Sequence, residues 1–373
     1  MLRQLMKSPF SRETLWSTFF LGRLTRVSLR LKSSRRIDSA MILAGDIGGT
    51  KTTLILFVAE KDCLRPVYRF HAWTKDFSSV VQLVEQFRAQ AEHETPGLGK
   101  TNLLAAAFGC AGAVVDGRVF TNNLPWPVET DAVAKVLGLD RSRTLLLNDL
   151  VATAASVPHL AHDSVLQLNQ AIPQERGTKA LIAAGTGLGE ALLFWDGTRY
   201  CISPSEASLT DFAPSNDREF ELLRSLRQRM RPVCCEEIVS GRGFRVIHQI
   251  LFPEVHHAWF HDPATDSAAN ITQQALAGSC PACVETLQVW VEAYAAEARN
   301  MALRILPFGG VYIAGGIAIK ILRKLKDGTF VRVFHDNDTL GRQLAQIPIY
   351  VLLNEDAAVF GAAYEALAAC SVS

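Results

Sequence analysis

The chain has 373 residues, 49% of them hydrophobic, and its 38 Lys and Arg residues nearly balance 37 Asp and Glu residues. This length exceeds the ~250–300 residues at which a single hydrophobic core stops growing, so we expect two domains. The net charge of +1 gives no general reason for a nucleic-acid or membrane partner, and no run reaches the ~18 apolar residues of a membrane span.

Residues 1–40 form a basic leader, with nine Lys and Arg residues against two acidic residues. A composition rich in Arg and Ser and poor in acids is typical of an organellar transit peptide. Met41 stands directly before the first predicted strand, however, so the segment fits equally well as an extension upstream of an internal start. On either interpretation the leader lies outside the predicted fold.

The first motif is GDIGGTKTT (residues 45–53), between two apolar segments that read as strands. A P-loop would need a glycine before Lys51 and a helix after it, and neither is present. We therefore predict a hairpin turn in which Gly48 and Gly49 adopt positive φ and offer backbone N–H groups to an anion. Asp46 suits a hydrated Mg²⁺. A purely structural glycine turn fits this composition about equally well.

The segments that follow alternate between helices and strands. An amphipathic helix is predicted over residues 79–94 and a buried strand with a turn over residues 102–114. A second helix is predicted from an N-cap at Thr130 to a stop at Gly138. The strand at residues 143–149 is apolar and ends in two polar residues. This order predicts an α/β domain.

A second glycine turn begins at Gly185, after the apolar strand KALIAA, and is followed by another strand. Helices are predicted over residues 217–230 and 283–306. Near the end, a strand at residues 311–316 leads through a double glycine into a helix over residues 317–327. Such a helix start is a natural place for a nucleotide. We expect two tightly joined domains with a cleft between them.

Eight cysteines in a chain of this length do not predict a disulfide framework. Cys280 and Cys283 form one Cys-x-x-Cys pair, and His257 and His261 are four residues apart. A zinc site usually shows two well-spaced pairs, and the histidine pair has no third ligand in view. The sequence therefore favours reduced, partly buried thiols over a metal site.

Five motifs, GDIGGT, LLLNDL, AAGTGLG, EEIVSG and YIAGGI, occur in this order, and with them the chain resembles the bacterial-type glucokinase family of actin-like sugar kinases. The likeness covers about residues 41–368, including TNNLPW, DFAPSN and LAGSCPAC. The related ROK kinases and repressors are less similar, because their Cys-rich zinc motif and N-terminal helix-turn-helix are missing here.

The resemblance implies an α/β chain with the two-domain actin-like ATPase (ribonuclease H-like) fold and an interdomain cleft. Residues 41–158 plus 354–373 would form a small α/β domain, and residues 159–353 a large α/β domain. It also implies ATP and Mg²⁺ as cofactors, a hexose as small-molecule substrate, a homodimer, and a cytoplasmic location. An organellar location would follow if residues 1–40 are a transit peptide.

The site residues are likewise implied by the resemblance. The nucleotide would be held by Gly45, Asp46, Ile47, Gly48, Gly49, Thr50, Gly185, Thr186, Gly187, Gly315 and Gly316, with Asp46 binding Mg²⁺ through water. Asp149 would be the catalytic base and would also contact the substrate. The sugar hydroxyls would be bound by Asn148, Glu206 and Glu236, and by Asn123 from a loop that resembles one lining the sugar pocket.

Physical reasoning supports these roles independently. A carboxylate just beyond a buried strand, as Asp149 is predicted to be, lies in a crevice where it is partly desolvated and can accept a proton from a hydroxyl. Phosphoryl transfer requires mainly alignment and charge stabilisation. Taken singly, Asn148 and Asp149 fit a strand-end turn, and Glu206 and Glu236 fit a solvated surface. Their joint order is what favours a site.

One segment departs from the family pattern. Where the family has Glu-Gly-Gly-His, this chain reads Glu206, Ala207, Ser208 and Leu209. Leucine neither donates nor accepts a hydrogen bond, so one sugar hydroxyl would lose its partner at a cost of about 1–3 kcal/mol, or roughly 5- to 150-fold in affinity.

We therefore expect an ATP-dependent hexose kinase that uses glucose first. Three alternatives stay open: a kinase for another hexose, a non-catalytic sugar-binding or regulatory relative, and an actin-like ATPase with a protein partner. The retention of Asp149 argues against a protein that only binds sugar, since such a protein needs no catalytic base.

Overall fold

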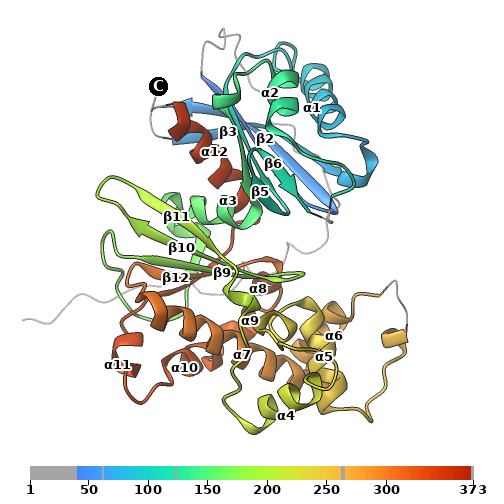
Figure 1. Ribbon diagram of the computed structural model, residues 1–373, viewed down its shortest axis with the longest axis vertical. Coiled ribbons are helices and arrows are strands. Elements are labelled where there is room, and N and C mark those ends of the chain that lie inside the picture. Colours follow the sequence, from blue (N-terminus) through green and yellow to red (C-terminus); the bar gives the residue numbers. More distant parts are fainter. Residues whose placement is uncertain (1–39, 61–62, 122–123, 262–264, 371–373) are drawn as a thin grey trace, which may run out of the picture. The chain divides into compact units, whose positions relative to one another are not determined.

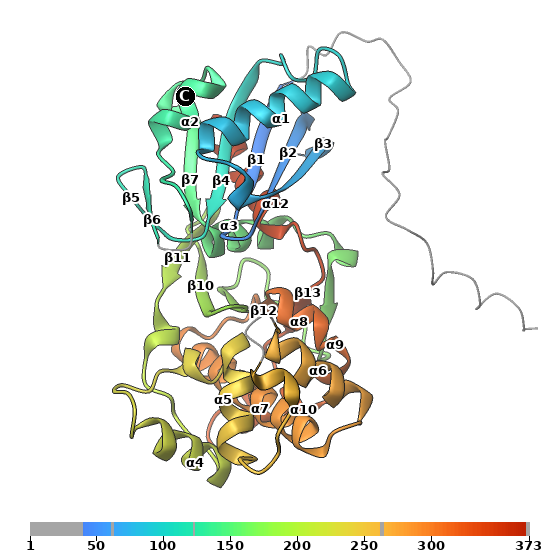
Figure 2. The ribbon, with the colours of Figure 1, turned by 90° about the vertical axis from the view of Figure 1, so that its right-hand side faces the viewer.

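The computed structural model describes residues 40–60, 63–121, 124–261 and 265–370. The predictions for the basic leader and for Asn123 lie outside these residues. Residues 39–373 belong to one compact unit, whose described part contains two large sheets and a small hairpin (Figures 1 and 2). Within the described ranges, no helix combines the length and apolarity needed to cross a bilayer.

The first sheet has the strand order β3-β2-β1-β4-β7. Its strands are β1 (Met41–Ile47), β2 (Lys51–Glu60), β3 (Cys63–Trp73), β4 (Leu103–Cys110) and β7 (Thr144–Asn148). The second sheet has the order β11-β10-β9-β12-β13-β8. Its strands are β8 (Val165–Gln167), β9 (Lys179–Ala184), β10 (Leu188–Trp195), β11 (Tyr200–Ser205), β12 (Gly310–Ala314) and β13 (Ile349–Leu352).

The two sheets repeat one pattern. In each, an antiparallel hairpin (β1–β2 or β9–β10) is extended on one side by a third antiparallel strand and on the other by two parallel strands. The hairpin turns predicted at Gly48–Gly49 and at Gly185 are thus both confirmed, and they occupy equivalent positions. The separate hairpin of β5 (Ala113–Val115) and β6 (Arg118–Phe120) was not predicted.

The helices surround these sheets. They are α1 (Val80–Glu94), α2 (Thr130–Leu137), α3 (Asp149–Ser156), α4 (Asp217–Leu226), α5 (Gly241–Leu251), α6 (Ser267–Ala277), α7 (Pro281–Ile305), α8 (Gly316–Lys320), α9 (Leu322–Leu325), α10 (Thr329–His335), α11 (Gly341–Leu344) and α12 (Ala357–Cys370).

Both faces of the first sheet are covered, which explains why the first four residues of β1 and residues 54–59 of β2 are apolar without alternation. Leu43 and Leu54 belong to the core on the face that carries α1 and α2. Ile42 and Phe57 point to the opposite face, where they pack with Ala362 of the C-terminal helix α12. The first sheet is therefore completed by residues from the far end of the chain.

Helix α3 lies between the two sheets, as Figure 1 shows, and contacts β4 and α12 on one side and β10 and β11 on the other. Helix α3 approaches β4 and α12 closely because glycines occupy the contact positions. A Cβ atom on Gly109 would lie 2.9 Å from the Ala152 Cβ, and one on Gly361 of α12 would lie 1.8 Å from the Ala152 carbonyl oxygen. Helix α3 therefore packs against elements of both large sheets.

Three local predictions need correction. The N-cap of α2 is Glu129, one residue before Thr130, although Gly138 ends the helix with φ 69° as expected. The helix predicted over residues 317–327 is divided into α8 and α9. Neither Gly48 nor Gly49 is among the described glycines with positive φ. Glycine is needed at position 48 for space instead, because a Cβ there would lie 2.9 Å from the Lys51 carbonyl oxygen.

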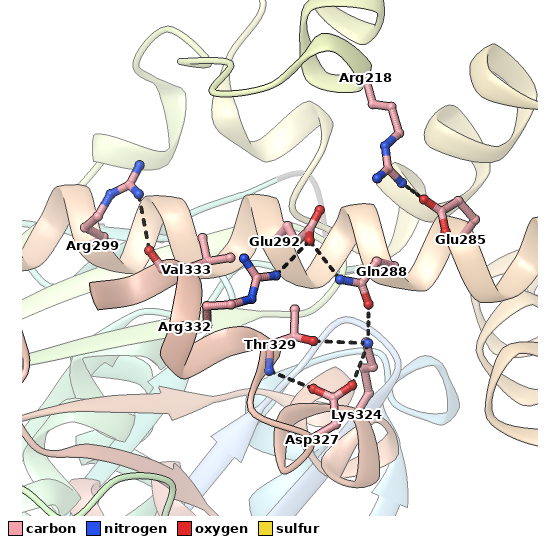
Figure 3. A network of polar contacts seen from close by, with 10 residues as sticks. All are labelled: Arg218, Glu285, Gln288, Glu292, Arg299, Lys324, Asp327, Thr329, Arg332 and Val333. Atoms are coloured by element: carbon pink, nitrogen blue, oxygen red, sulfur yellow. Dashed lines mark hydrogen bonds and ion pairs between the residues drawn. The ribbon is translucent and has the colours of Figure 1, made fainter. Parts of the chain in front are cut away.

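The long helix α7 packs against β9 of the second sheet, where the Tyr294 hydroxyl donates to the Ile182 carbonyl at 3.0 Å. Polar side chains of α7 also contact α9 and α10 (Figure 3). The Lys324 ammonium donates to the Gln288 side-chain oxygen and pairs with Asp327 at 2.6 Å. Arg332 of α10 donates to Glu292 at 3.2 Å. Each of these two ion pairs keeps one partner exposed to solvent, and such pairs contribute only ~0.2–1 kcal/mol each, so the network adds little to the stability of the fold.

Glu190 of β10 is a buried carboxyl group with one side-chain oxygen that lacks a hydrogen-bond partner. Burial first, and then the nearby Glu297, raise its pKa from the ordinary 4.5 to about 8, although Arg304 opposes the shift. Because the folded-state pKa is the higher one, the group favours the folded state most below pH 4.5, and this contribution is lost as the pH rises through about 8.

Glu190→Gln is therefore expected to raise the melting temperature at about pH 9 and to change it little near pH 5, because only the ionised carboxylate is costly to bury. Melting curves at several pH values check this, with the exposed Glu175→Gln as control. An increase that is the same at both pH values would contradict the assignment.

Candidate active site

A cavity of about 870 Å³ lies where the parallel strands of both sheets end. Residues that follow β1, β4 and β7 line it from the first sheet, and residues that follow β9, β12 and β13 line it from the second. In α/β sheets, ligands bind beyond the carboxyl ends of the strands, where loops leave the sheet in different directions. In this molecule, the edges of both sheets where the parallel strands end face the same cavity.

The first glycine hairpin brings Gly48, Gly49 and Thr50 to the cavity. Thr74, fully buried at the end of β3, fixes this turn: its hydroxyl donates to the Gly48 carbonyl at 2.6 Å, and its backbone N–H donates to the Thr50 carbonyl at 3.0 Å. Sequence reasoning missed Thr74, since nothing local to it signals a contact with a turn more than twenty residues earlier.

Asp149 lines the same cavity as the first residue of α3, directly after β7. Asn148 does not line it. Its amide oxygen accepts from the backbone N–H groups of Leu150 and Val151, and its amide nitrogen donates to the Gly112 carbonyl at 3.0 Å. Asn148 thus acts as the N-cap of α3 and fixes the backbone that carries Asp149.

Carboxylates gather at this edge of the first sheet. Burial, then Asp149 and then Asp356, raise the pKa of Asp46 to about 7. Burial also raises the pKa of Asp149, while the Leu150 backbone N–H, which donates to its Oδ1 at 2.9 Å, opposes the shift. Asp356, just after β13, is held by an ion pair with Arg69 at 2.5 Å. Sequence reasoning missed Asp356.

A divalent cation fits this arrangement. Oxygen ligands from carboxylates suit Mg²⁺, and a positive charge would offset both the burial and the mutual repulsion that raise the pKa of Asp46. Asp46 lines the cavity, and Asp149 raises its pKa more than Asp356 does.

The second glycine hairpin brings Gly185, Thr186 and Gly187 to the cavity from the other sheet. Glu236, in a 3₁₀ turn, fixes this hairpin: its Oε2 accepts from the Leu188 backbone N–H at 3.0 Å, and its Oε1 accepts from Arg242 at 2.9 Å. A Cβ on Gly187 would lie 2.5 Å from the Glu236 Oε2, so only glycine fits there. Glu236 also lines the cavity.

The predicted nucleotide residues Gly315 and Gly316 also line the cavity, at the start of α8. Gly315 has φ 91°, and a Cβ on it would lie 2.3 Å from the Ala184 carbonyl oxygen. The backbone at the end of β12 can therefore run against the end of β9 only with glycine at this position.

Three further predicted residues do not line the cavity: Gly45, Ile47 and Glu206. Gly45 and Ile47 belong to β1, where a Cβ on Gly45 would lie 2.4 Å from Leu54 and where the Ile47 side chain is buried in the core. Glu206 is exposed at the end of β11. A strand alternates its side chains between two faces, so contiguous motif residues cannot all face one ligand.

The altered segment after Glu206 forms a short 3₁₀ turn, Ala207–Leu209, which contacts the turn that carries Glu236. The Cys235 backbone N–H donates to the Thr210 carbonyl at 3.1 Å, which joins the two turns. The Leu209 side chain is 51% exposed. Leu209 therefore stands beside the predicted sugar-binding carboxylates without packing into the core.

The family comparison and the curated relatives both point to one family. Residues 43–369 match the family described as Glucokinase. The glucokinase of Nostoc sp. strain PCC 7120 is 34% identical over 342 residues, which cover 87% of this chain and 98% of that protein.

Solved structures are similar over most of the chain. The glucokinase from an Antarctic psychrotroph has a TM-score of 0.75 and 23% identity, and the match covers 88% of this chain and 99% of that one. A ROK family glucokinase from Streptomyces griseus in complex with glucose and AMPPNP has a TM-score of 0.57 and 21% identity, with coverage of 87% and 98%.

Proposed function

The chain belongs to the glucokinase family, and from this premise we propose that it transfers the γ-phosphoryl group of ATP to the 6-hydroxyl of glucose. It is accordingly an ATP-dependent hexose kinase with the two-domain actin-like ATPase fold that the sequence predicts. The main support for this reaction is the position of Asp149, which lines the same cavity as both glycine hairpins.

The predicted domain division becomes part of this proposal. The strands of the first sheet lie within residues 41–148, and α12 packs on that sheet, which supports a small domain of residues 41–158 plus 354–373. The strands of the second sheet lie within residues 165–352, which supports a large domain of residues 159–353.

In this proposal Asp149 accepts the proton of the attacking hydroxyl. Burial raises its pKa, which brings the carboxylate closer to the proton affinity that suits a base near neutral pH. The N-cap contacts of Asn148 hold the first turn of α3, so the carboxylate keeps a fixed direction. Asn148 thereby serves as a positioning residue. Glu236 is assigned to the sugar hydroxyls because it lines the cavity, and the family resemblance assigns Glu206 to them as well.

The two hairpins and Gly315–Gly316 are assigned to ATP. Backbone groups in glycine turns can approach phosphates closely, because no side chain intervenes. Asp46 and Asp149, which both line the cavity, supply the carboxylates that would hold Mg²⁺ near those phosphates. When bound, Mg²⁺ neutralises charge that develops on the transferring phosphoryl group. The S. griseus relative, whose structure holds glucose and AMPPNP, supports this pair of substrates.

Coupled measurement of ADP release tests the proposal. Purified chain is given Mg·ATP with glucose, mannose, fructose, N-acetylglucosamine or no sugar, and turnover is expected to be fastest with glucose. Turnover that prefers another hexose would establish a different sugar kinase. ADP release that is indifferent to sugar would indicate an ATPase, and no turnover at any sugar concentration would favour a regulatory protein.

Leu209→His is expected to lower the KM for glucose roughly 5- to 150-fold, because the histidine would restore a hydrogen-bond partner worth about 1–3 kcal/mol. Steady-state kinetics over a wide glucose range check this. Leu209→Phe, which adds a ring of similar shape without hydrogen-bonding groups, should not lower the KM. A KM that stays unchanged in Leu209→His would remove Leu209 from the sugar site.

The proposal includes a cytoplasmic homodimer, which the family resemblance implies. Size-exclusion chromatography with light scattering gives the mass in solution, and a monomer with full activity would remove dimerisation from the proposal.

A further inference from the structure

A second group of chemically reactive side chains lies away from the proposed active site, between α5, α6 and α7. His248, His257, Cys280 and Cys283 each bring one ligand atom to a common point, and these atoms all lie within 4.8 Å of one another. They come from the last turn of α5, the connection between α5 and α6, and the first turn of α7. None of them lines the cavity described above.

We propose that these four residues form a structural Zn²⁺ site. In a tetrahedral site with Zn–S near 2.3 Å and Zn–N near 2.0–2.1 Å, neighbouring ligand atoms are about 3.3–3.8 Å apart. The His257 Nε2 lies 3.8 Å from the Cys280 Sγ and 3.7 Å from the Cys283 Sγ. These separations are those of ligands around one metal, and four protein ligands leave no open position for catalysis.

His248 provides an independent reason. It is fully buried, and neither of its ring nitrogens has a hydrogen-bond partner among the described residues. A buried polar group that lacks a hydrogen-bond partner destabilises the folded state. The ring lies beside that of His257, with centroids 5.2 Å apart. A metal bonded to one of its nitrogens would remove part of this cost.

The cysteines have the backbone arrangement of metal ligands. Cys280 is the N-cap of α7, and its sulfur accepts a hydrogen bond from the Cys283 backbone N–H at 3.4 Å. Two thiolates and two neutral imidazoles around Zn²⁺ carry no net charge, which makes burial of the group less costly than that of an unpaired ion.

The surroundings exclude water on one side. Trp259 stacks on His257 at 4.5 Å between centroids, and Phe260 packs against both histidine rings. Sequence reasoning examined Cys280, Cys283 and His257 but missed His248, and it rejected a metal because no further ligand was in view. His248 is separated from Cys280 by a helix and a long connection, so no short motif links them.

The site would hold α5 in place. The Gly241 backbone N–H, at the start of α5, donates to the Gly185 carbonyl at 2.8 Å in the second glycine hairpin. His248 is seven residues further along the same helix. A metal that joins this end of α5 to α7 would therefore support the hairpin from outside the active site.

Metal analysis of the purified full chain tests the proposal. Elemental analysis is expected to give one Zn²⁺ per chain in the wild type and in Cys63→Ser/Cys201→Ser, which removes two exposed thiols elsewhere. Cys280→Ser/Cys283→Ser should lose the metal, and His257→Ala should weaken its binding by at least about tenfold. Zinc retained in full by the Cys280→Ser/Cys283→Ser variant would overturn the assignment.

A measurement on the wild type alone avoids variants that fail to fold. The metal is removed with a chelator and replaced by Co²⁺, which should give a sulfur-to-cobalt charge-transfer band and the intense visible bands of tetrahedral Co²⁺. The melting temperature should fall on removal and recover on addition of Zn²⁺. Absence of the charge-transfer band, or a disulfide between Cys280 and Cys283 in freshly purified protein, would overturn the proposal in favour of a thiol pair.

Discussion

Asp149→Asn is expected to lower kcat by about 10²–10⁴-fold while leaving the melting temperature unchanged or slightly higher. The amide cannot accept the proton of the sugar hydroxyl, but its oxygen can still accept from the Leu150 backbone N–H. Burial raises the pKa of the Asp149 carboxyl, so its ionised form is costly in the folded protein and the neutral amide is not.

Coupled ADP release and thermal melting, measured on the same preparation, separate catalysis from folding. Asp140→Asn provides the control, since Asp140 is exposed, lies four residues before β7, and makes no side-chain cap hydrogen bond. Wild-type kcat in Asp149→Asn would show that this residue is not the base. A loss of activity matched by a large drop in melting temperature would point to a structural role.

Gly361→Ala is expected to destabilise the fold by about 3 kcal/mol or more, at the upper end of what overpacking costs. Its Cβ would lie 1.8 Å from the Ala152 carbonyl oxygen and 2.6 Å from the Ser156 backbone nitrogen, so one helix must move. Both neighbours are backbone atoms of α3, which cannot turn aside as a flexible side chain can. Since α3 begins with Asp149, kcat should fall as well.

Chemical denaturation gives the free energy of unfolding directly. Gly316→Ala is the matched control, because it makes the same substitution in a helix where a Cβ would meet nothing within 4 Å. Alanine is intrinsically better than glycine in a helix by ~0.8–1 kcal/mol, so the control should be neutral or slightly stabilised. A Gly361→Ala variant as stable as the control would contradict the steric clash between α12 and α3 that these distances predict.

The elements around the cavity were predicted well because their signals are local. The apolar segments beside each glycine turn predicted both hairpins. The polar residues at the end of the apolar strand β7 predicted that Asp149 lies at a strand end. The details of the first turn were wrong, because Gly48 is required by its distance to the Lys51 carbonyl oxygen and not by its φ angle. That requirement exists only after the chain has folded.

Residues brought in from distant parts of the chain were missed for the same reason. Thr74 reaches Gly48 from the edge strand β3, and Asp356 reaches the first sheet from the end of the second. His248 lies on an amphipathic helix, where a buried histidine has no pattern to distinguish it from other core residues. Spacing rules recognise ligands that are near in sequence, and these three are near only in space.

The packing of α12 has a consequence for how the chain is made. Phe57 and Ile42 are covered by residues of α12, so this face of the first sheet lacks that cover until residues 357–370 have left the ribosome. At ~5–20 residues per second, the interval between β1 and α12 lasts tens of seconds. Nascent chains should therefore present an apolar surface to chaperones throughout synthesis, and ribosome-stalled chains that end before residue 357 should stay sensitive to proteases.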